Sequence, residues 1–182
     1  NVVLGASYGI LCGLAGQKLA EGAHQIAVEQ NPDLMDLCHR NAASRHDSDI
    51  QVFNHVVSYA EVTADDDPGE DPSGGAPTPR PNGLDVPGTS LGQLLEDVAL
   101  DGFYSLICNI GGTELDLIEH DEDALSRCCF LLMTLHPRSY YQRDVLVTAL
   151  IEKLEAIGFE IVEVSGNHIA AVQAMDRAQP SQ

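Results

Sequence analysis

The chain has 182 residues, enough for one ordinary domain, and 44% of them are hydrophobic, which argues against disorder. It carries 28 acids against 9 bases, a formal net charge of −19, so repulsion disfavours nucleic acid and anionic membranes as partners. No apolar run approaches the roughly 20 residues that span a bilayer, and no signal peptide opens the chain. We therefore expect a cytoplasmic protein without nucleic-acid or membrane partners, and the oligomeric state stays open.

The acid excess has an unusual counterpart among the bases, because only Lys18 and Lys153 are lysines. This composition is typical of halophilic proteins from a salt-loaded cytoplasm, where molar salt screens self-repulsion within about 3 Å. A merely acidic protein is the alternative. Five cysteines without a C-x-x-C pair indicate free thiols in a reducing compartment, not a zinc site.

The hydrophobic pattern alternates between strand-like and helix-like segments. Seven strands are expected, at Val2–Leu4, Gln25–Glu29, Ile50–Val57, Phe103–Ile110, Cys129–Leu135, Phe159–Val164 and His168–Ala174. Helices are expected at Ile10–Ala20, from Pro32 onward, and at Ser90–Val98, Thr113–Ile118 and Tyr141–Ile157, the last closed by Gly158. Residues 58–63 extend the third strand or form a short extra one.

Residues 64–88 differ from the rest, since they hold six acids, six prolines and five glycines. Such a segment cannot build a core, so we expect an acidic surface loop without a calcium-binding pattern. The remainder indicates an α/β fold over residues 1–176, followed by a short tail at 177–182. It predicts a mostly parallel seven-stranded sheet with helices on both faces and a C-terminal antiparallel hairpin.

Two features suggest a ligand site. The glycine-rich turn Gly5–Gly9 joins the first strand to the first helix, where a ligand can approach the backbone and the free N–H groups of the helix start. Glu29 follows the second strand, 24 residues after Gly5, where an acid can accept hydrogen bonds from both hydroxyls of a ribose. A plain tight turn and a surface acid are the alternatives. Together the two features favour a nucleoside-type ligand.

These residues carry a resemblance to a known family. The segments Val2–Gly9 and Ile26–Pro32 resemble an S-adenosylmethionine-dependent methyltransferase of the Rossmann-like class. Leu106–Glu114 narrows the resemblance to the FkbM family, whose fourth strand ends in an Asp-x-Glu-Gly-x-Glu pattern. Leu135-His136 is similar to that family's Glu-x-His at the end of strand five. The resemblance covers residues 2 to about 174.

The resemblance implies methyl transfer to a hydroxyl of a sugar or small metabolite. The methyl donor would be S-adenosylmethionine, with S-adenosylhomocysteine as product and no metal. His136 is the candidate general base, because it is a titratable group at the end of a central strand, where such sheets bind ligands; a structural histidine is the alternative. Asn109 is the second candidate catalytic residue, while Glu114 orients the substrate or stabilises the helix start. The implied cofactor-binding residues are Gly5, Ala6, Ser7, Tyr8, Gly9, Glu29, Gln30, Asn31 and Asn109.

One alternative stays open, because three acids of the family pattern are replaced by Val3, Asn109 and Gly111. The chain would then be a catalytically degenerate methyltransferase fold, acting as a weak nucleoside-binding or interaction module. A nicotinamide dehydrogenase is disfavoured, since the first loop lacks the full G-x-G-x-x-G spacing.

Overall fold

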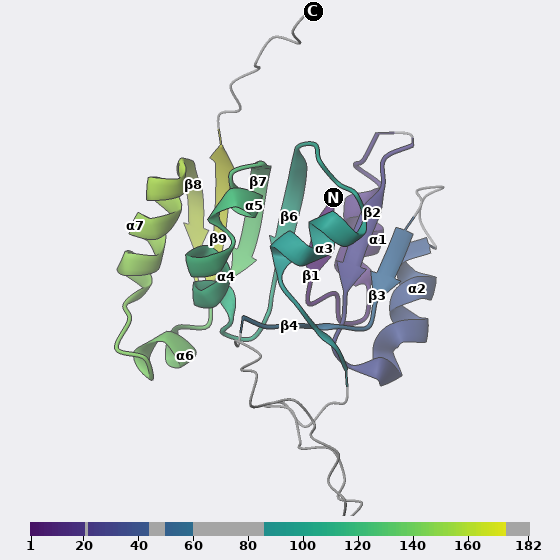
Figure 1. Cartoon of the computed structure of the whole chain (residues 1–182), viewed down its shortest axis with the longest axis horizontal. Helices are drawn as coiled ribbons and strands as arrows, with labels where there is room; N and C mark the ends of the chain where they lie inside the picture. Colours follow the sequence, from purple (N-terminus) through teal and green to yellow (C-terminus); the bar gives the residue numbers. More distant parts are fainter. Residues whose placement is uncertain (21, 44–49, 60–85, 174–182) are drawn as a thin grey trace, which may run out of the picture.

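The computed structural model describes residues 1–20, 22–43, 50–59 and 86–173 (Figure 1). Its main sheet has the strand order β3-β2-β1-β6-β7-β9-β8. The strands are β1 (Val2–Leu4), β2 (Gln25–Val28), β3 (Ile50–Phe53), β6 (Tyr104–Cys108), β7 (Cys128–Thr134), β8 (Phe159–Ser165) and β9 (His168–Gln173). β1, β2, β3, β6 and β7 pair in parallel, and β9 lies antiparallel between β7 and β8. The predicted α/β fold with its terminal hairpin is confirmed.

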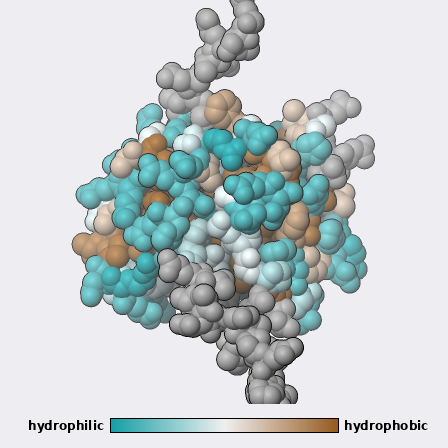
Figure 2. All heavy atoms as spheres, viewed as in Figure 1, coloured by the Kyte–Doolittle hydropathy of each residue, from teal (hydrophilic) through white to brown (hydrophobic). Residues whose placement is uncertain are grey.

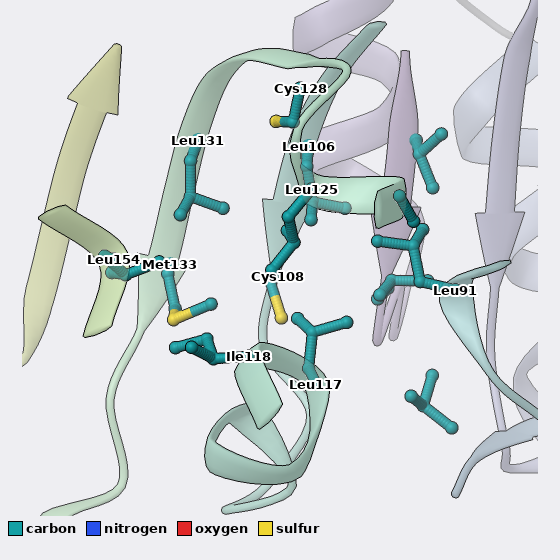
Figure 3. Close-up of a cluster of buried hydrophobic side chains, with 14 of the residues drawn as sticks. Leu91, Leu106, Cys108, Leu117, Ile118, Leu125, Cys128, Leu131, Met133 and Leu154 are labelled. Carbon is teal, nitrogen blue, oxygen red and sulfur yellow. The ribbon is translucent and has the colours of Figure 1, made fainter. Parts of the chain in front are cut away.

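Helices cover the two faces of the sheet. One face packs against α3 (Leu91–Asp97), α4 (Glu114–His120), α5 (Glu122–Leu125) and α7 (Val147–Ile157). This larger core includes Leu106, Leu131 and Met133 from the strands and Leu117 and Leu154 from the helices (Figure 3). On the other face α1 (Ile10–Gly16) and α2 (Met35–Ala43) enclose a smaller cluster. Its buried members are Val3, Ala6, Cys12, Ala27, Cys38 and Ala42.

Helices lie near both edges of the main sheet. In Figure 1, α7 and the terminal hairpin lie at one end, and α1 and α2 lie at the other. Figure 2 shows hydrophilic residues over most of the visible face, as the composition requires. Within the described ranges no helix has the length and hydrophobicity that crossing a bilayer requires.

The third strand is shorter than predicted. It ends at Phe53, and residues Val56–Val57 form β4, which leaves the main sheet and pairs in parallel with β5 (Gly88–Thr89). The cause is Asn54, whose side-chain amide donates hydrogen bonds to the carbonyls of Glu29 and Gln30 at 2.8 and 3.2 Å. Residues 60–63, and residues 64–85 of the expected acidic loop, lie outside the described residues.

Two helix predictions are corrected. The helix expected at Ile10–Ala20 ends at Gly16, where tight i→i−3 hydrogen bonds from Lys18 and Leu19 close the chain into a turn. The helix expected at Tyr141–Ile157 starts only at Val147, as α7, and a separate short helix, α6 (Pro137–Tyr141), precedes it. Asp144 separates them with a left-handed φ of 56°.

Other helix boundaries changed less. α4 extends to His120, two residues beyond its predicted end, and the short α5 that follows was not predicted. A 3-10 turn (Pro32–Leu34) precedes α2, so the helix predicted from Pro32 starts with tighter winding. Gly158 caps α7 with φ 112°, as expected.

Candidate functional site

A cavity of about 840 Å³ lies at the carboxyl ends of the central parallel strands. This volume is within the range of small-molecule sites, and the position is where α/β sheets bind their ligands. Each of four strand ends contributes to its lining, and two further segments complete it. The lining residues are Gly5 and Ser7 after β1, 28–30 at the end of β2, 55–59 after β3, 109–111 after β6, and Thr113, Asp116 and Arg143.

The glycine-rich loop is folded tightly onto its neighbours. The backbone N–H groups of Gly5 and Ala6 donate to the carbonyl of Val28 at 3.0 and 2.9 Å. Gly5 has φ 77°, and a Cβ there would overlap the carbonyl oxygen of Asn109. Only glycine satisfies both conditions, so the backbones that follow β1 and β6 are in contact where they line the cavity.

Glu29 is the buried carboxylate of the cavity, with 6% of its surface exposed. Oε2 accepts the N–H of Ser7 at 2.6 Å, and Oε1 accepts the N–H of Asn31 at 2.7 Å. A carboxylate offers about four acceptor positions, so each oxygen retains one for a ligand. Glu29 therefore fixes both loops and can still accept hydrogen bonds from a diol.

A second buried carboxylate, Glu114, organises the other side of the site. It is fully buried, and its Oε1 accepts the N–H groups of Ile110 and Gly112, both at 3.2 Å. Oε2 accepts the hydroxyl of Tyr140 at 2.8 Å, and burial raises the pKa of that phenol, which keeps it protonated. Glu114 thus fixes the turn that carries the cavity residues 110 and 111.

His136 is held by the same carboxylate. Its Nδ1 lies 2.8 Å from Oε1 of Glu114, and its backbone N–H donates to the Tyr140 hydroxyl at 3.1 Å. With Glu114 ionised, this contact assigns the imidazole proton to Nδ1 and leaves Nε2 as an acceptor. About a third of the His136 side chain, 32%, is exposed.

The outer wall of the cavity carries paired charges. Arg143 donates to Asp116 at 2.8 Å and lies 3.7 Å from Glu119, which also accepts from Lys153 at 3.0 Å. Among the described residues, Asp116, Glu119 and His120 have the spacing of a metal site. Arg143 and Lys153 already neutralise the two carboxylates, so we assign no metal there.

Tyr59 closes the wall on the β4 side. Its hydroxyl donates to the buried Asp121 at 2.6 Å, and its ring stacks on His120 with centroids 5.7 Å apart. Asp121 also accepts the N–H of Leu91 at 2.7 Å. Burial raises the pKa of the Tyr59 phenol, so it remains a donor. This hydrogen bond fixes residues 55–59 against the start of α3.

The structure brings together only part of the predicted site. Five predicted residues line the cavity, namely Gly5, Ser7, Glu29, Gln30 and Asn109. The other five lie outside the lining. Ala6 is buried, and Gly9 packs against the backbone of Cys38. Tyr8 is 52% exposed, while Asn31 donates to Glu29 and caps the turn before α2. His136 contacts Glu114 instead of lining the cavity. Glu114 in turn accepts the N–H of Ile110, in the turn that follows β6.

Sequence reasoning missed the cavity residues His55, Tyr59, Asp116 and Arg143. Because the third strand was extended to Val57, His55 was hidden inside it, although Asn54 already marks a strand end. The Nδ1 of His55 is buried and has no hydrogen-bond partner among the described residues. Arg143 was missed for a similar reason, because it lies between α6 and α7, in a segment that was predicted to be helical.

Comparison with known proteins gives a result for the fold alone. No family model matches the chain, and a search of curated proteins finds no match. Among solved structures, the ribosomal protein L11 methylase from Lactobacillus delbrueckii subsp. bulgaricus matches with a TM-score of 0.51 and 18% identity. The match covers 95% of this chain and 69% of that chain. This chain therefore shares its α/β fold with that methylase. The match supports the predicted fold and does not extend to the FkbM family.

Proposed function

We propose that this protein is an S-adenosylmethionine-dependent methyltransferase. The observation that carries the proposal is Glu29, which is fixed by the N–H groups of Ser7 and Asn31 and lines a cavity of about 840 Å³ beside the glycine turn. A rigid carboxylate with remaining acceptor positions is suited to a ribose diol. The fold shared with a methylase supports the same assignment.

The other lining residues fit a nucleoside-containing cofactor. Val28, Val56 and Val57 offer apolar contact to a purine ring, and His55 also lines the cavity. Asn109 and Gly5 line the cavity side by side, where they can bind the polar amino-acid part. When bound, S-adenosylmethionine supplies an electrophilic methyl group on a sulfonium centre.

We further propose that the methyl acceptor is a hydroxyl of a sugar or small metabolite, with His136 as the general base. The Glu114 carboxylate holds Nδ1–H of the imidazole, so Nε2 can take the hydroxyl proton. Asn109 would orient the acceptor oxygen through its side-chain amide. Because the cluster around Glu114 also holds the cavity turn at Ile110, base and cavity share one rigid support.

Calorimetric titration with S-adenosylhomocysteine tests the binding part. We expect saturable heat, and we expect Asn109→Asp to tighten binding about 10–100-fold, because a carboxylate adds a charge-assisted hydrogen bond to the ligand ammonium group. Asp101→Asn, an opposite charge change at an exposed position outside the site, is the control. No heat at millimolar ligand, at low and at high salt, contradicts the proposal.

The rate of methyl transfer tests the base. In a panel of sugars and small hydroxylated metabolites, we expect His136→Gln to lower kcat about 10²–10⁴-fold while the affinity for S-adenosylhomocysteine stays unchanged. A kcat within a few-fold of wild type would remove His136 from the mechanism. Loss of cofactor affinity in the variant would instead assign it to binding.

The degenerate fold is the second candidate, and Asn109 and Gly111 favour it. Both line the cavity, so its lining after β6 lacks the carboxylates that the family pattern has at these positions. Val3, the third replaced position, is 1% exposed in the small core and does not line the cavity. Binding of S-adenosylhomocysteine without turnover of any acceptor, together with turnover in a variant carrying Asn109→Asp and Gly111→Glu, would establish this candidate.

A further inference from the structure

One half of a sheet face carries no helix in the described part of the chain. α1 and α2 enclose the smaller cluster over β1, β2 and β3. The other described α-helices all contribute to the larger core on the opposite face. The side of β6, β7 and β9 that faces away from the larger core is therefore uncovered by these helices, and we call it the open half.

The open half is lined by apolar side chains. Leu131 and Met133 of β7 point into the larger core (Figure 3), so the alternate residues Phe130 and Leu132 point to the open half. Ile107 of β6 pairs with Leu132 and lies on the same face. The row continues across β9 at Ala170 and Val172. Parallel strands such as β6 and β7 are normally covered on both faces, so this row predicts a further layer here.

α1 extends the apolar surface. It connects β1 to β2, and β6 is the other neighbour of β1, so α1 borders the open half. Its residues Ile10, Leu11 and Leu14 are 59%, 43% and 46% exposed, and Phe130 is 40% exposed. At roughly half of the 150–250 Å² that a large side chain can bury, these four present on the order of 300–500 Å². Soluble monomers rarely expose a larger apolar patch, and two such patches approach the roughly 1,000 Å² of a specific interface.

Charge selects the occupant of this surface. Residues 1–20 contain no acid, although the chain has 28, and the apolar row of β6, β7 and β9 contains none. Glu160 and Glu163 of β8, which pair with Val172 and Ala170, lie at its edge. A basic partner would be attracted to the acidic remainder of the protein, whereas a strongly acidic partner can approach closely only where acids are absent. A second copy of this chain, with its net charge of −19, is such a partner.

We propose that the chain forms a symmetric dimer in which α1 of each copy packs on the open half of the other. Each copy offers both parts of the contact, an exposed apolar helix and an uncovered apolar sheet face. A contact that uses the same surface of both copies closes at two, so no larger assembly follows from it. The dimer requires neither a cofactor nor a methyl acceptor.

The mass of the wild-type protein in solution tests the dimer. In about 1 M potassium chloride, where repulsion is screened within about 3 Å, we expect light scattering to show one copy in dilute solution and two at submillimolar protein. We expect weaker association at about 0.1 M, where repulsion extends over about 10 Å. A protein that stays monomeric at every concentration in both salts would overturn the proposal.

Matched variants locate the contact. Leu14→Glu on α1 and Phe130→Glu on the open half each place an acid in the interface, so we expect the dissociation constant to rise at least about tenfold. Leu146→Glu is the control, because it makes the same change at an exposed leucine next to α7, on the opposite face. A dimer that both variants retain, or that the control also loses, would overturn the proposal. Melting of each variant in dilute solution identifies one that fails to fold.

Hydroxyl-radical footprinting of the wild type needs no variant. We expect oxidation of Leu14 and Phe130 to fall when the protein is concentrated, while that of Leu146 stays unchanged. Equal oxidation of all three in dilute and concentrated protein would place any contact elsewhere. Strong protection of Leu14 and Phe130 already in the dilute monomer would mean that another part of the same chain covers the open half. Either result would overturn the proposal.

Discussion

Three acids of the described chain, Glu29, Glu114 and Asp121, are buried, and each fixes one wall of the cavity. Glu29 accepts the N–H groups of the first two loops, Glu114 those of the turn after β6, and Asp121 the Tyr59 hydroxyl and the start of α3. An ionised carboxylate is buried at low cost only when N–H and O–H donors surround it. In this acidic chain the buried acids are therefore building elements of the site, unlike the exposed majority.

Glu29→Gln should weaken ligand binding and folding together. An amide has one acceptor oxygen, so its NH₂ group would face the N–H of Ser7 or Asn31, donor against donor. We expect the Kd for S-adenosylhomocysteine to rise about 10–100-fold, because a charge-assisted hydrogen bond is lost. We also expect the melting temperature to fall by roughly 2–8 °C. Calorimetry and thermal melts measure the two effects.

The melting temperature keeps this prediction independent of the ligand. Asp101→Asn removes the same charge at an exposed position and should leave both quantities unchanged. If Glu29→Gln melts with the wild type, the carboxylate does not hold the two loops together, and its assigned role is wrong.

At the scale of elements, the sequence predicted where the strands of the main sheet lie. It did not predict several helix ends or the end of β3. β1 and residues 26–28 of β2 are apolar and buried on both faces, which is the pattern of central parallel strands. The end of β3 depends instead on Asn54 reaching the carbonyls of Glu29 and Gln30, a contact across strands that local sequence does not reveal.

The same reasoning explains why only five of the residues that line the cavity were predicted. The glycine turn and Glu29 are local patterns with a known ligand chemistry. His55 and Arg143 reach the cavity through a strand end and a helix break that tertiary contacts decide.

The break between α6 and α7 can be tested with a matched pair of variants. Asp144 has φ 56°, where a side chain costs about 1–2 kcal/mol and glycine fits without strain. Asp144→Gly and Asp144→Ala both remove the carboxylate, so their difference isolates the backbone. We expect the glycine variant to melt roughly 2–4 °C above the alanine variant. Equal melting temperatures, or a more stable alanine variant, would mean that the helix continues through residue 144.

At the scale of the whole molecule, acidic side chains greatly outnumber basic ones. The chain has 28 acids and 9 bases, and in the described part Arg143 and Lys153 are the only lysine or arginine residues whose side chains pair with carboxylates. Among the described residues most acids therefore face solvent without a lysine or arginine partner, and the mutual repulsion of the acids opposes the compact state. The repulsion extends over about 10 Å at 0.1 M salt but only about 3 Å at 1 M.

We accordingly expect stability to depend strongly on salt. The melting temperature should rise steeply as potassium chloride increases from about 0.05 M to about 1 M, and level off as screening saturates. Replacing the exposed Glu96, Glu152 and Glu155 by glutamine should reduce the slope, because fewer like charges remain to be screened. Sucrose, which favours burial without screening charge, separates the electrostatic part from general stabilisation. A flat curve, or an equal slope in the neutralised variant, would mean that self-repulsion is negligible, and it would remove the basis for expecting a salt-adapted protein.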